Sequence, residues 1–266
     1  MTWVIGAASL LGGYGVMVSD TQVTFGDDRT VELVRKSYPV GPWFAGGFAG
    51  SVQIGFSLLE SISRFLVVPA KAPANSAWDP IYVAEKWAPI ARQIFESAAA
   101  EQQALGAQFL LIGPHPTEDI VMPGRARPYV CKFNFPAFQP EIQGGQFAVS
   151  IGSGADVPEY RSGIVSALEF DSGMLQAEVG PMGGWAQALN IAITTMLEDT
   201  PVRGIGPYVH MHIVERGQIR VATNDRTLLP SDGEPIEIRM PRVAQSWDEL
   251  LQFAQEIGAN ALTARC

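Results

Sequence analysis

Thr2 directly follows Met1 and opens an apolar, strand-like run, Trp3–Ala7. Removal of the methionine would leave a threonine with both a hydroxyl and a free α-amine. A hydroxyl is a poor nucleophile until a base takes its proton, and an α-amine with an ordinary pKa of about 7.7–8.0 can do so at neutral pH. The start of the sequence therefore offers a nucleophile with its own base.

A carboxylate and an ammonium group follow at fixed distances. Asp20 lies in the polar turn Ser19–Gln22, and Lys36 comes sixteen positions later, just before a second apolar stretch. An ammonium group beside Thr2 would lower the pKa of its hydroxyl and amine, provided that a carboxylate holds it in place. Taken alone, Asp20 is also typical of an ordinary turn and Lys36 of a solvated surface. We expect Lys36 beside Thr2, with Asp20 as its anchor.

A glycine-rich stretch, Gly46–Gly50, closes the second apolar run. The oxyanion formed during acyl transfer needs a backbone N–H aimed at it, and glycine lets the chain approach closely. Gly50 is the first candidate for this donor and Gly47 the second.

The order of these motifs resembles the proteasome β-subunit family, most of all the bacterial ring peptidase that works with an ATP-driven unfoldase. That family has an N-terminal threonine, an aspartate in a short turn, a lysine sixteen residues on and a GFAG-like loop, as in Thr2, Asp20, Lys36 and Gly47–Gly50. Ile151–Gly154 is similar to the family's IGSG loop, and the resemblance places Ser153 near the amine, where it relays protons through water. The resemblance is clear over about 70 residues, patchy to roughly 215 and absent beyond.

The resemblance implies an α+β fold, a four-layer αββα sandwich of the N-terminal nucleophile hydrolase type. It implies a threonine-type endopeptidase without metal or organic cofactor, acting on peptides or unfolded proteins in a homo-oligomeric ring, with an ATP-dependent unfoldase as a possible partner. The implied catalytic residues are Thr2, Asp20, Lys36, Gly50 and Ser153.

One segment departs from the family pattern. The family places a further aspartate and a Ser-Gly pair near the amine, whereas the corresponding stretch here is Val202–Tyr208, which lacks both. Two alternatives therefore stay open. One is a catalytically inactive assembly or binding subunit, and the other is a non-peptide amidase that uses the same nucleophile.

Composition limits the other classes of function. The 266 residues are 47% hydrophobic and 17% charged, as in ordinary globular proteins, and the net charge of −9 disfavours nucleic-acid binding. Two cysteines imply no disulfide framework, and no apolar run is long enough for a membrane span, so we expect a cytoplasmic protein. The pair His210 and His212 could bind a metal but lacks further ligands at a suitable spacing, so we expect structural or partly exposed histidines.

Hydrophobic periodicity predicts the elements that position the site. Strands are expected over 2–9, 15–24, 40–48, 109–112, 129–135, 146–151 and 208–214, and helices over 51–67, 80–105, 157–170, 182–199 and 247–257. A loop is expected over 71–78. We expect a hydrolase domain over 1–224 and a C-terminal extension over 225–266, whose amphipathic helix packs on the domain or on a neighbouring subunit.

Overall fold

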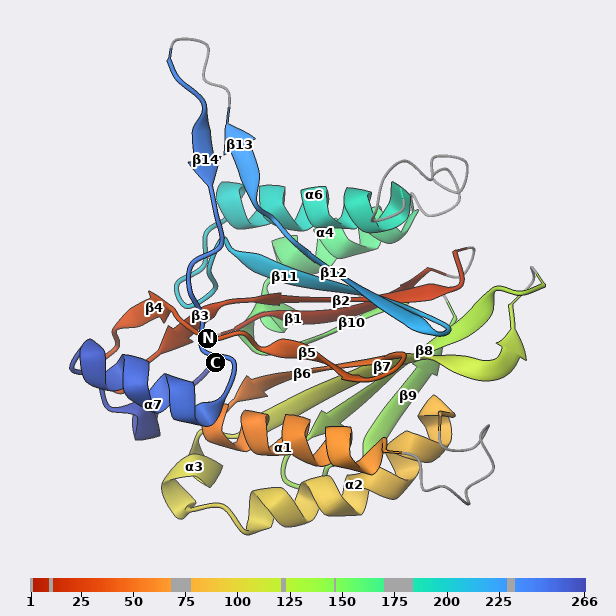
Figure 1. The fold of residues 1–266 in the computed structure, drawn as a ribbon, viewed down its shortest axis with the longest axis horizontal. Helices are drawn as coiled ribbons and strands as arrows, with labels where there is room; N and C mark the ends of the chain where they lie inside the picture. Colours follow the sequence, from red (N-terminus) through yellow and green to blue (C-terminus); the bar gives the residue numbers. More distant parts are fainter. Residues whose placement is uncertain are drawn as a thin grey trace.

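Two five-stranded antiparallel sheets lie face to face with helices on both outer sides (Figure 1). The computed structural model describes residues 2–9, 12–67, 78–120, 123–145, 147–169, 184–228 and 233–266. The predicted four-layer αββα sandwich is therefore confirmed.

The first sheet has the strand order β10-β1-β2-β11-β12. Its strands are β1 (Val4–Ser9), β2 (Tyr14–Asp20), β10 (Phe147–Ile151), β11 (Val209–Glu215) and β12 (Gln218–Thr223). The helices α4 (Pro158–Glu169) and α6 (Gly184–Asp199) cover its outer face (Figure 1). Both faces of β1 are buried, since Ile5 and Ala7 pack toward these helices and Val4 packs between the sheets. This explains why the strand is apolar throughout and does not alternate.

The second sheet has the order β5-β6-β7-β8-β9. Its strands are β5 (Ser37–Gly41), β6 (Phe44–Gly50), β7 (Ala107–Asp119), β8 (Ala126–Asn134) and β9 (Pro140–Gly144), and α1 (Val52–Phe65), α2 (Pro80–Glu96) and α3 (Ala100–Ala104) lie on its outer side (Figure 1). The helix starts follow local chemistry, because Ser51 and Asp79 accept hydrogen bonds from the free backbone N–H groups of α1 and α2.

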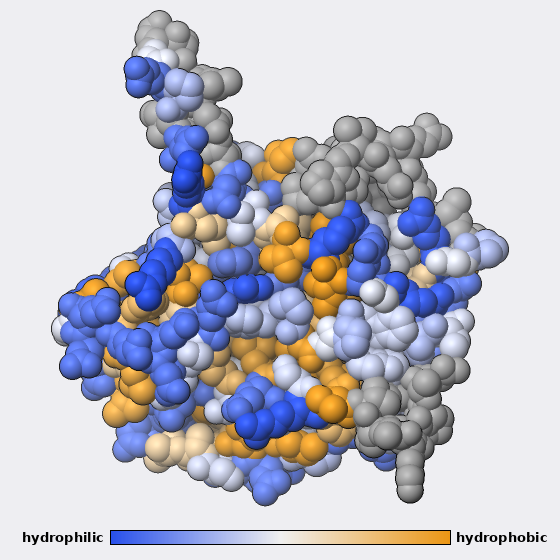
Figure 2. Space-filling model, in the orientation of Figure 1, coloured by the Kyte–Doolittle hydropathy of each residue, from blue (hydrophilic) through white to orange (hydrophobic). Residues whose placement is uncertain are grey.

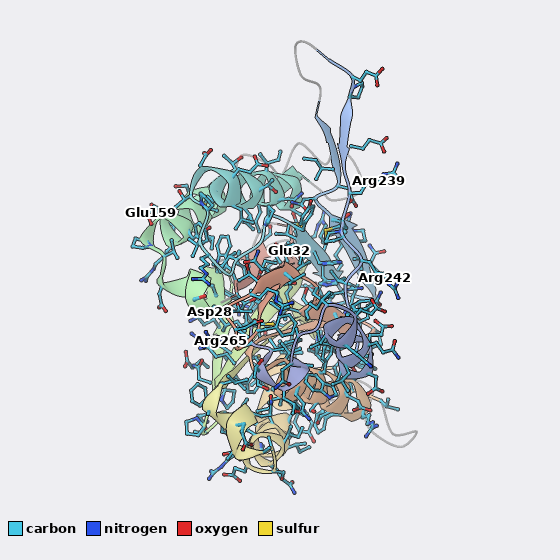
Figure 3. The ribbon with its side chains drawn as sticks, turned by 90° about the vertical axis from the view of Figure 1, so that its left-hand side faces the viewer. Asp28, Glu32, Glu159, Arg239, Arg242 and Arg265 are labelled. Carbon is cyan, nitrogen blue, oxygen red and sulfur yellow. The ribbon has the colours of Figure 1, made fainter. Side chains whose placement is uncertain are left out.

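Short elements surround the sandwich. They are the hairpins β3 (Gln22–Thr24) with β4 (Thr30–Glu32) and β13 (Arg226–Leu228) with β14 (Ile236–Ile238), the helix α7 (Trp247–Glu256), and the 3₁₀ turns η1 (Ser153–Asp156) and η2 (Ala261–Thr263). The β13–β14 hairpin projects from the body of the molecule in both ribbon views (Figures 1 and 3).

Three predicted boundaries were wrong. The strand expected over 40–48 is two strands, β5 and β6, joined by a tight turn. The helix expected over 80–105 ends at Glu96, and α3 starts afresh at Ala100, although the alanine-rich run between them has high helix propensity. The strand expected over 15–24 is divided at Thr21 into β2 and β3, and no strand was predicted for β4, β9, β12, β13 or β14. Residues 71–77 of the predicted loop lie outside the described residues.

The helix predicted near the end of the chain is present as α7. Ser246 Oγ accepts a hydrogen bond from Glu249 N at 3.2 Å, and the Glu249 carboxylate accepts one from Gln245 N at 2.8 Å. Leu250 and Phe253 are buried in the cluster that also contains the inner faces of α1 and α2. The helix therefore covers this chain's own core. In the part of the chain that the structure describes, no helix combines the length and apolar character needed to cross a bilayer.

Candidate active site

Thr2, Asp20 and Lys36 form one buried cluster, and each side chain has almost no exposed surface. Lys36 Nζ donates hydrogen bonds to both Asp20 carboxylate oxygens at 2.8 Å and also to Thr2 Oγ1. Thr2 Oγ1 in turn donates to Asp20 Oδ1 at 2.8 Å. A hydroxyl, an ammonium group and a carboxylate thus share one water-excluded position.

Strand pairing positions these three side chains. Because β1 and β2 pair with Val4 opposite Ser19, Trp3 lies opposite Asp20 at the end of β2, and Thr2 is the next residue along the chain. Trp3 N also donates to Asp20 Oδ1 at 2.9 Å. Lys36 comes from the other sheet, where its carbonyl accepts a hydrogen bond from Phe48 N at 3.1 Å. The cluster therefore spans the interface between the sheets.

Backbone N–H groups complete the environment of the Asp20 carboxylate. Its Oδ2 accepts hydrogen bonds from Gln22 N at 3.0 Å and from Gly206 N at 3.3 Å. A buried ion pair is tolerated when hydrogen bonds satisfy its remaining lone pairs, and here they do. Gly206 belongs to Val202–Tyr208, the segment that departs from the family pattern. This segment therefore still contacts the cluster, through a backbone N–H.

The loop that begins η1 contacts the backbone of Thr2. Thr2 N donates to Ser153 Oγ at 3.1 Å, and Gly154 N donates to Thr2 O at 3.0 Å. Gly152 has a φ of +79°, and a Cβ added there would lie 2.5 Å from both Thr2 Cγ2 and Thr2 O. Glycine is required at this position by both its conformation and the close approach of Thr2.

The two oxyanion-donor candidates have different surroundings. Gly47 lies inside β6, where an added Cβ would lie 2.8 Å from Val4 Cγ1, so it packs between the sheets. Gly50 ends β6 with a φ of +96°, and its N–H donates to the carbonyl of Cys266 at 2.8 Å. Of the two, Gly50 is the residue whose N–H makes its hydrogen bond outside the five-stranded sheet.

One carboxylate near the cluster was not predicted. Glu32, on β4, accepts hydrogen bonds from Thr21 Oγ1 and from Gln22 Nε2, the latter at 2.8 Å. Burial raises the pKa of Glu32, and the nearby charge of Asp20 adds to the increase. Glu32 belongs to a short hairpin whose sequence contains no recognisable motif. A Cβ added at Gly206 would lie 2.1 Å from Glu32 Oε1, so the glycine at position 206 is the one feature of the sequence related to this carboxylate.

The histidine pair on β11 faces the protein interior. His212 Nε2 lies 3.0 Å from both the carbonyl and the hydroxyl oxygen of Ser37. Burial lowers the pKa of His210 to about 4 and that of His212 to about 3, so both are neutral at pH 7. Within the described ranges, no three His, Cys, Asp or Glu side chains come close enough together to hold a metal ion.

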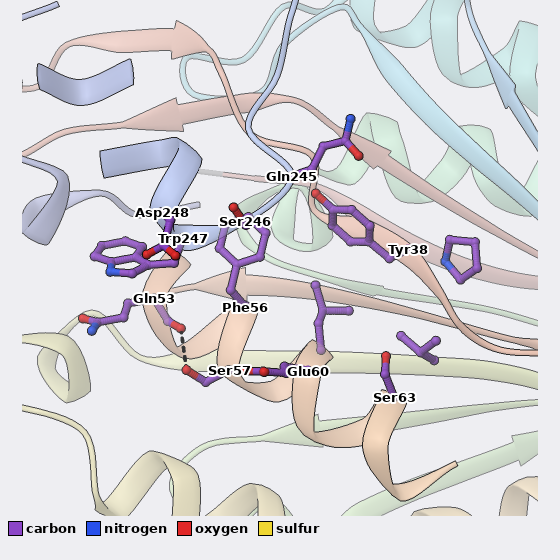
Figure 4. Close-up of a pocket in the computed structure, with 13 residues that line it drawn as sticks. Tyr38, Gln53, Phe56, Ser57, Glu60, Ser63, Gln245, Ser246, Trp247 and Asp248 are labelled. Carbon is purple, nitrogen blue, oxygen red and sulfur yellow. Dashed lines mark hydrogen bonds between the residues drawn. The ribbon is translucent and has the colours of Figure 1, made fainter. Parts of the chain in front are cut away.

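A hollow of about 550 Å³ lies between β5, α1 and the start of α7, and its lining includes none of Thr2, Asp20 and Lys36 (Figure 4). Tyr38, Phe56 and Trp247 supply its apolar surface, and Glu60 and Asp248 supply its carboxylates. Apolar surface gathers over the middle of this face of the molecule (Figure 2). The lining includes neither histidine nor cysteine.

Comparison with solved structures identifies a relative in fold. The chain is similar to Anbu (ancestral beta-subunit) from Yersinia bercovieri, with a TM-score of 0.59 and 14% sequence identity, covering 84% of this chain and 87% of that one. At this identity the likeness shows the fold alone, a proteasome-like αββα sandwich. No protein-family model matches the sequence, and no curated protein matches it.

Proposed function

We propose that the chain is a threonine-type N-terminal nucleophile hydrolase that cleaves peptide bonds. The observation that carries the proposal is the contact of Lys36 Nζ with both Thr2 Oγ1 and the Asp20 carboxylate in a buried setting. A positive charge beside a hydroxyl favours the alkoxide and lowers the pKa of that hydroxyl, and exclusion of water strengthens the effect.

The proposed reaction has two steps that share one base. After Met1 is removed, the Thr2 α-amine takes the hydroxyl proton as Oγ1 attacks the peptide carbonyl, and the oxyanion accepts the Gly50 N–H. Collapse of the intermediate breaks the C–N bond, and the α-ammonium protonates the leaving amine. Water, deprotonated by the same amine, then hydrolyses the ester. Ser153 lies 3.1 Å from Thr2 N, a suitable position for transferring this proton.

Assembly into a homo-oligomeric ring belongs to the same proposal, with unfolded proteins as substrates and an ATP-dependent unfoldase as a partner. Two facts support it. The fold relative is named a subunit, and the outer helices α4 and α6 expose apolar side chains, Val165 at 51% and Ile191 at 58%. Enclosure in a cytoplasmic ring would keep such a site away from folded proteins.

Hydrolysis of a fluorogenic peptide tests the proposal. The protein is prepared with Thr2 as its first residue, as verified by intact mass, and compared with Thr2→Ala and Thr2→Ser. We expect the alanine variant to lose activity and the serine variant to retain part of it, because serine keeps the hydroxyl. Hydrolysis of small amides without peptide cleavage would support the amidase alternative. Absence of both activities in protein that lacks Met1 would support the inactive subunit.

A further inference from the structure

The segment Ala264–Cys266 lies as an extended strand in a slot beside the cluster. On one side, Thr24 and Arg265 exchange two backbone hydrogen bonds of 2.9 Å. On the other side, Gly50 and Cys266 exchange two backbone hydrogen bonds of 2.8 Å. The segment runs antiparallel to both neighbours, so it acts as a middle strand between β3 and the end of β6.

The side chains of this segment alternate between the interior and solvent. Ala264 and Cys266 are buried, whereas the side chain of Arg265 is half exposed and lies 3.7 Å from Asp28 (Figure 3). Burial raises the pKa of the Cys266 thiol to about 11, and the positive charge of Lys36 partly opposes this. The thiol is therefore within electrostatic range of the catalytic ammonium group.

Preceding residues hold the segment in place. Gln102 is buried and connects two elements, since it accepts a hydrogen bond from Ser51 Oγ and donates one to Leu262 O, each at 2.6 Å. Gly26 N donates to Thr263 Oγ1 at 2.8 Å. A strand tethered this close to its slot has an effective concentration in the millimolar range.

A peptide substrate would need the same slot. An extended peptide binds by adding a strand to exposed backbone groups, and its reacting carbonyl would have to accept the Gly50 N–H. That N–H has a single hydrogen, and the carbonyl of Cys266 already accepts it. Occupation by the segment and by a substrate in this position therefore exclude each other.

We propose that Ala264–Cys266 is a peptide ligand held in cis, which fills the strand slot of the site and inhibits it until it is displaced. The inference rests on the proposed function in one respect, namely that peptide substrates bind in the same slot. It also defines the ligand class, which is an extended peptide with small apolar side chains at the positions of Ala264 and Cys266 and an unrestricted side chain between them.

Peptide binding tests the inference without requiring catalysis. The probe is a fluorescein-labelled peptide with the sequence of residues 260–266, carrying alanine in place of cysteine, and the readout is fluorescence anisotropy. We expect a variant that lacks residues 264–266 to bind the probe at least about tenfold more tightly than the full chain, because a tethered competitor is removed. Equal affinities of the full chain and the deletion variant would overturn the inference, as would the absence of binding to a folded deletion variant.

A pair of substitutions addresses the case in which the deletion variant does not fold. Arg265→Pro removes the N–H that Thr24 O accepts, whereas Arg265→Ala keeps it and changes only the half-exposed side chain. We expect tighter probe binding for the proline variant and unchanged binding for the alanine variant. The same affinity in both would contradict a strand held by its backbone.

Labelling of Thr2 by a small β-lactone separates this inference from the proposed function. Gain of probe binding without any Thr2 adduct would support the cis ligand and refute the hydrolase. Thr2 adducts that form equally fast in the full chain and the deletion variant, without a gain in probe binding, would support the hydrolase and refute the cis ligand.

Discussion

At Lys36 a buried ammonium group contacts the groups that the proposed chemistry requires, a hydroxyl and a carboxylate. The order and spacing of motifs, through the family resemblance, predicted that Thr2, Asp20 and Lys36 would lie together. Glu32 and the Gly206 N–H were not predicted. Their approach depends on backbone and hairpin geometry, which leaves no pattern in residue types.

Lys36→Met tests the role of the ammonium group. We expect peptide hydrolysis to fall by at least about 10²-fold, because the positive charge near the developing negative charge is lost. Stability should fall by about 3–5 kcal/mol, because Asp20 stays buried without its partner. Urea titration and a fluorogenic assay measure the two effects. The control is Lys86→Met on the exposed face of α2, and equal behaviour of both variants would argue against the assignment.

Gly152→Ala tests the close approach of the η1 loop to Thr2. The added Cβ would lie 2.5 Å from the Thr2 side chain and carbonyl, so we expect loss of activity through displacement of Thr2. The matched control is Gly217→Ala, where φ is also positive, at +89°, but no atom lies within 4 Å of the added Cβ. The control should show a modest loss of stability and full activity. Unchanged activity in Gly152→Ala would show that the approach is not required.

At the scale of elements, long and strongly periodic segments were predicted well. The helices α1 and α7 and the strands β1 and β2 follow their patterns, because one buried face or a continuous apolar run defines each of them. The interruption between α2 and α3, in an alanine-rich stretch of high helix propensity, was not predicted. The end of α2 at Glu96 leaves room for Gln102 to turn inward, which is a tertiary contact that helix propensity does not contain.

Ser246→Ala tests the cap of α7. The variant loses the hydrogen bond from Glu249 N, and we expect a cost of about 1 kcal/mol. For a chain of this size the melting temperature should fall by about 2–4 °C. Ser57→Ala, on the exposed face of α1, is the control and should leave the melting temperature nearly unchanged, because alanine is favourable inside a helix. Equal shifts in differential scanning fluorimetry would mean that the cap contributes nothing specific.

For the whole molecule, the layer order followed from the family resemblance and could not be derived from periodicity, which predicts elements but not their stacking. The division at residue 224 and the ring stay predictions. The structure shows that two histidines are buried between the sheets and that burial lowers their pKa values, so both are neutral at pH 7. The sequence did not indicate these lowered pKa values.

Those histidines predict the response of stability to acid. Their folded-state pKa values, about 4 for His210 and about 3 for His212, lie below the ordinary value of 6.5, so the unfolded chain binds more protons between those limits. Stability should therefore decrease as pH falls below about 6.5, by roughly 2 kcal/mol per histidine at pH 5. Urea midpoints at pH 7 and pH 5 measure this decrease. A variant with His210→Gln and His212→Gln should show a smaller decrease in stability between pH 7 and pH 5. A decrease equal to that of the unsubstituted chain would mean that other groups cause it.

Oligomeric state tests the ring. Light scattering coupled to size-exclusion chromatography should give a mass several times the 28.7 kDa of one chain. Ile191→Glu on α6 should lower that mass if the exposed apolar side chains lie at the contact, whereas a monomeric native chain would contradict the ring.

The most direct measurement of the central claim is covalent mapping of the nucleophile. Protein without Met1 is incubated with a threonine-directed β-lactone, digested and sequenced by mass spectrometry. The proposed chemistry predicts one adduct, on Thr2, that is absent from Thr2→Ala and strongly reduced in Lys36→Met. An adduct on another residue, or none on Thr2 in folded protein that lacks both Met1 and residues 264–266, would contradict it.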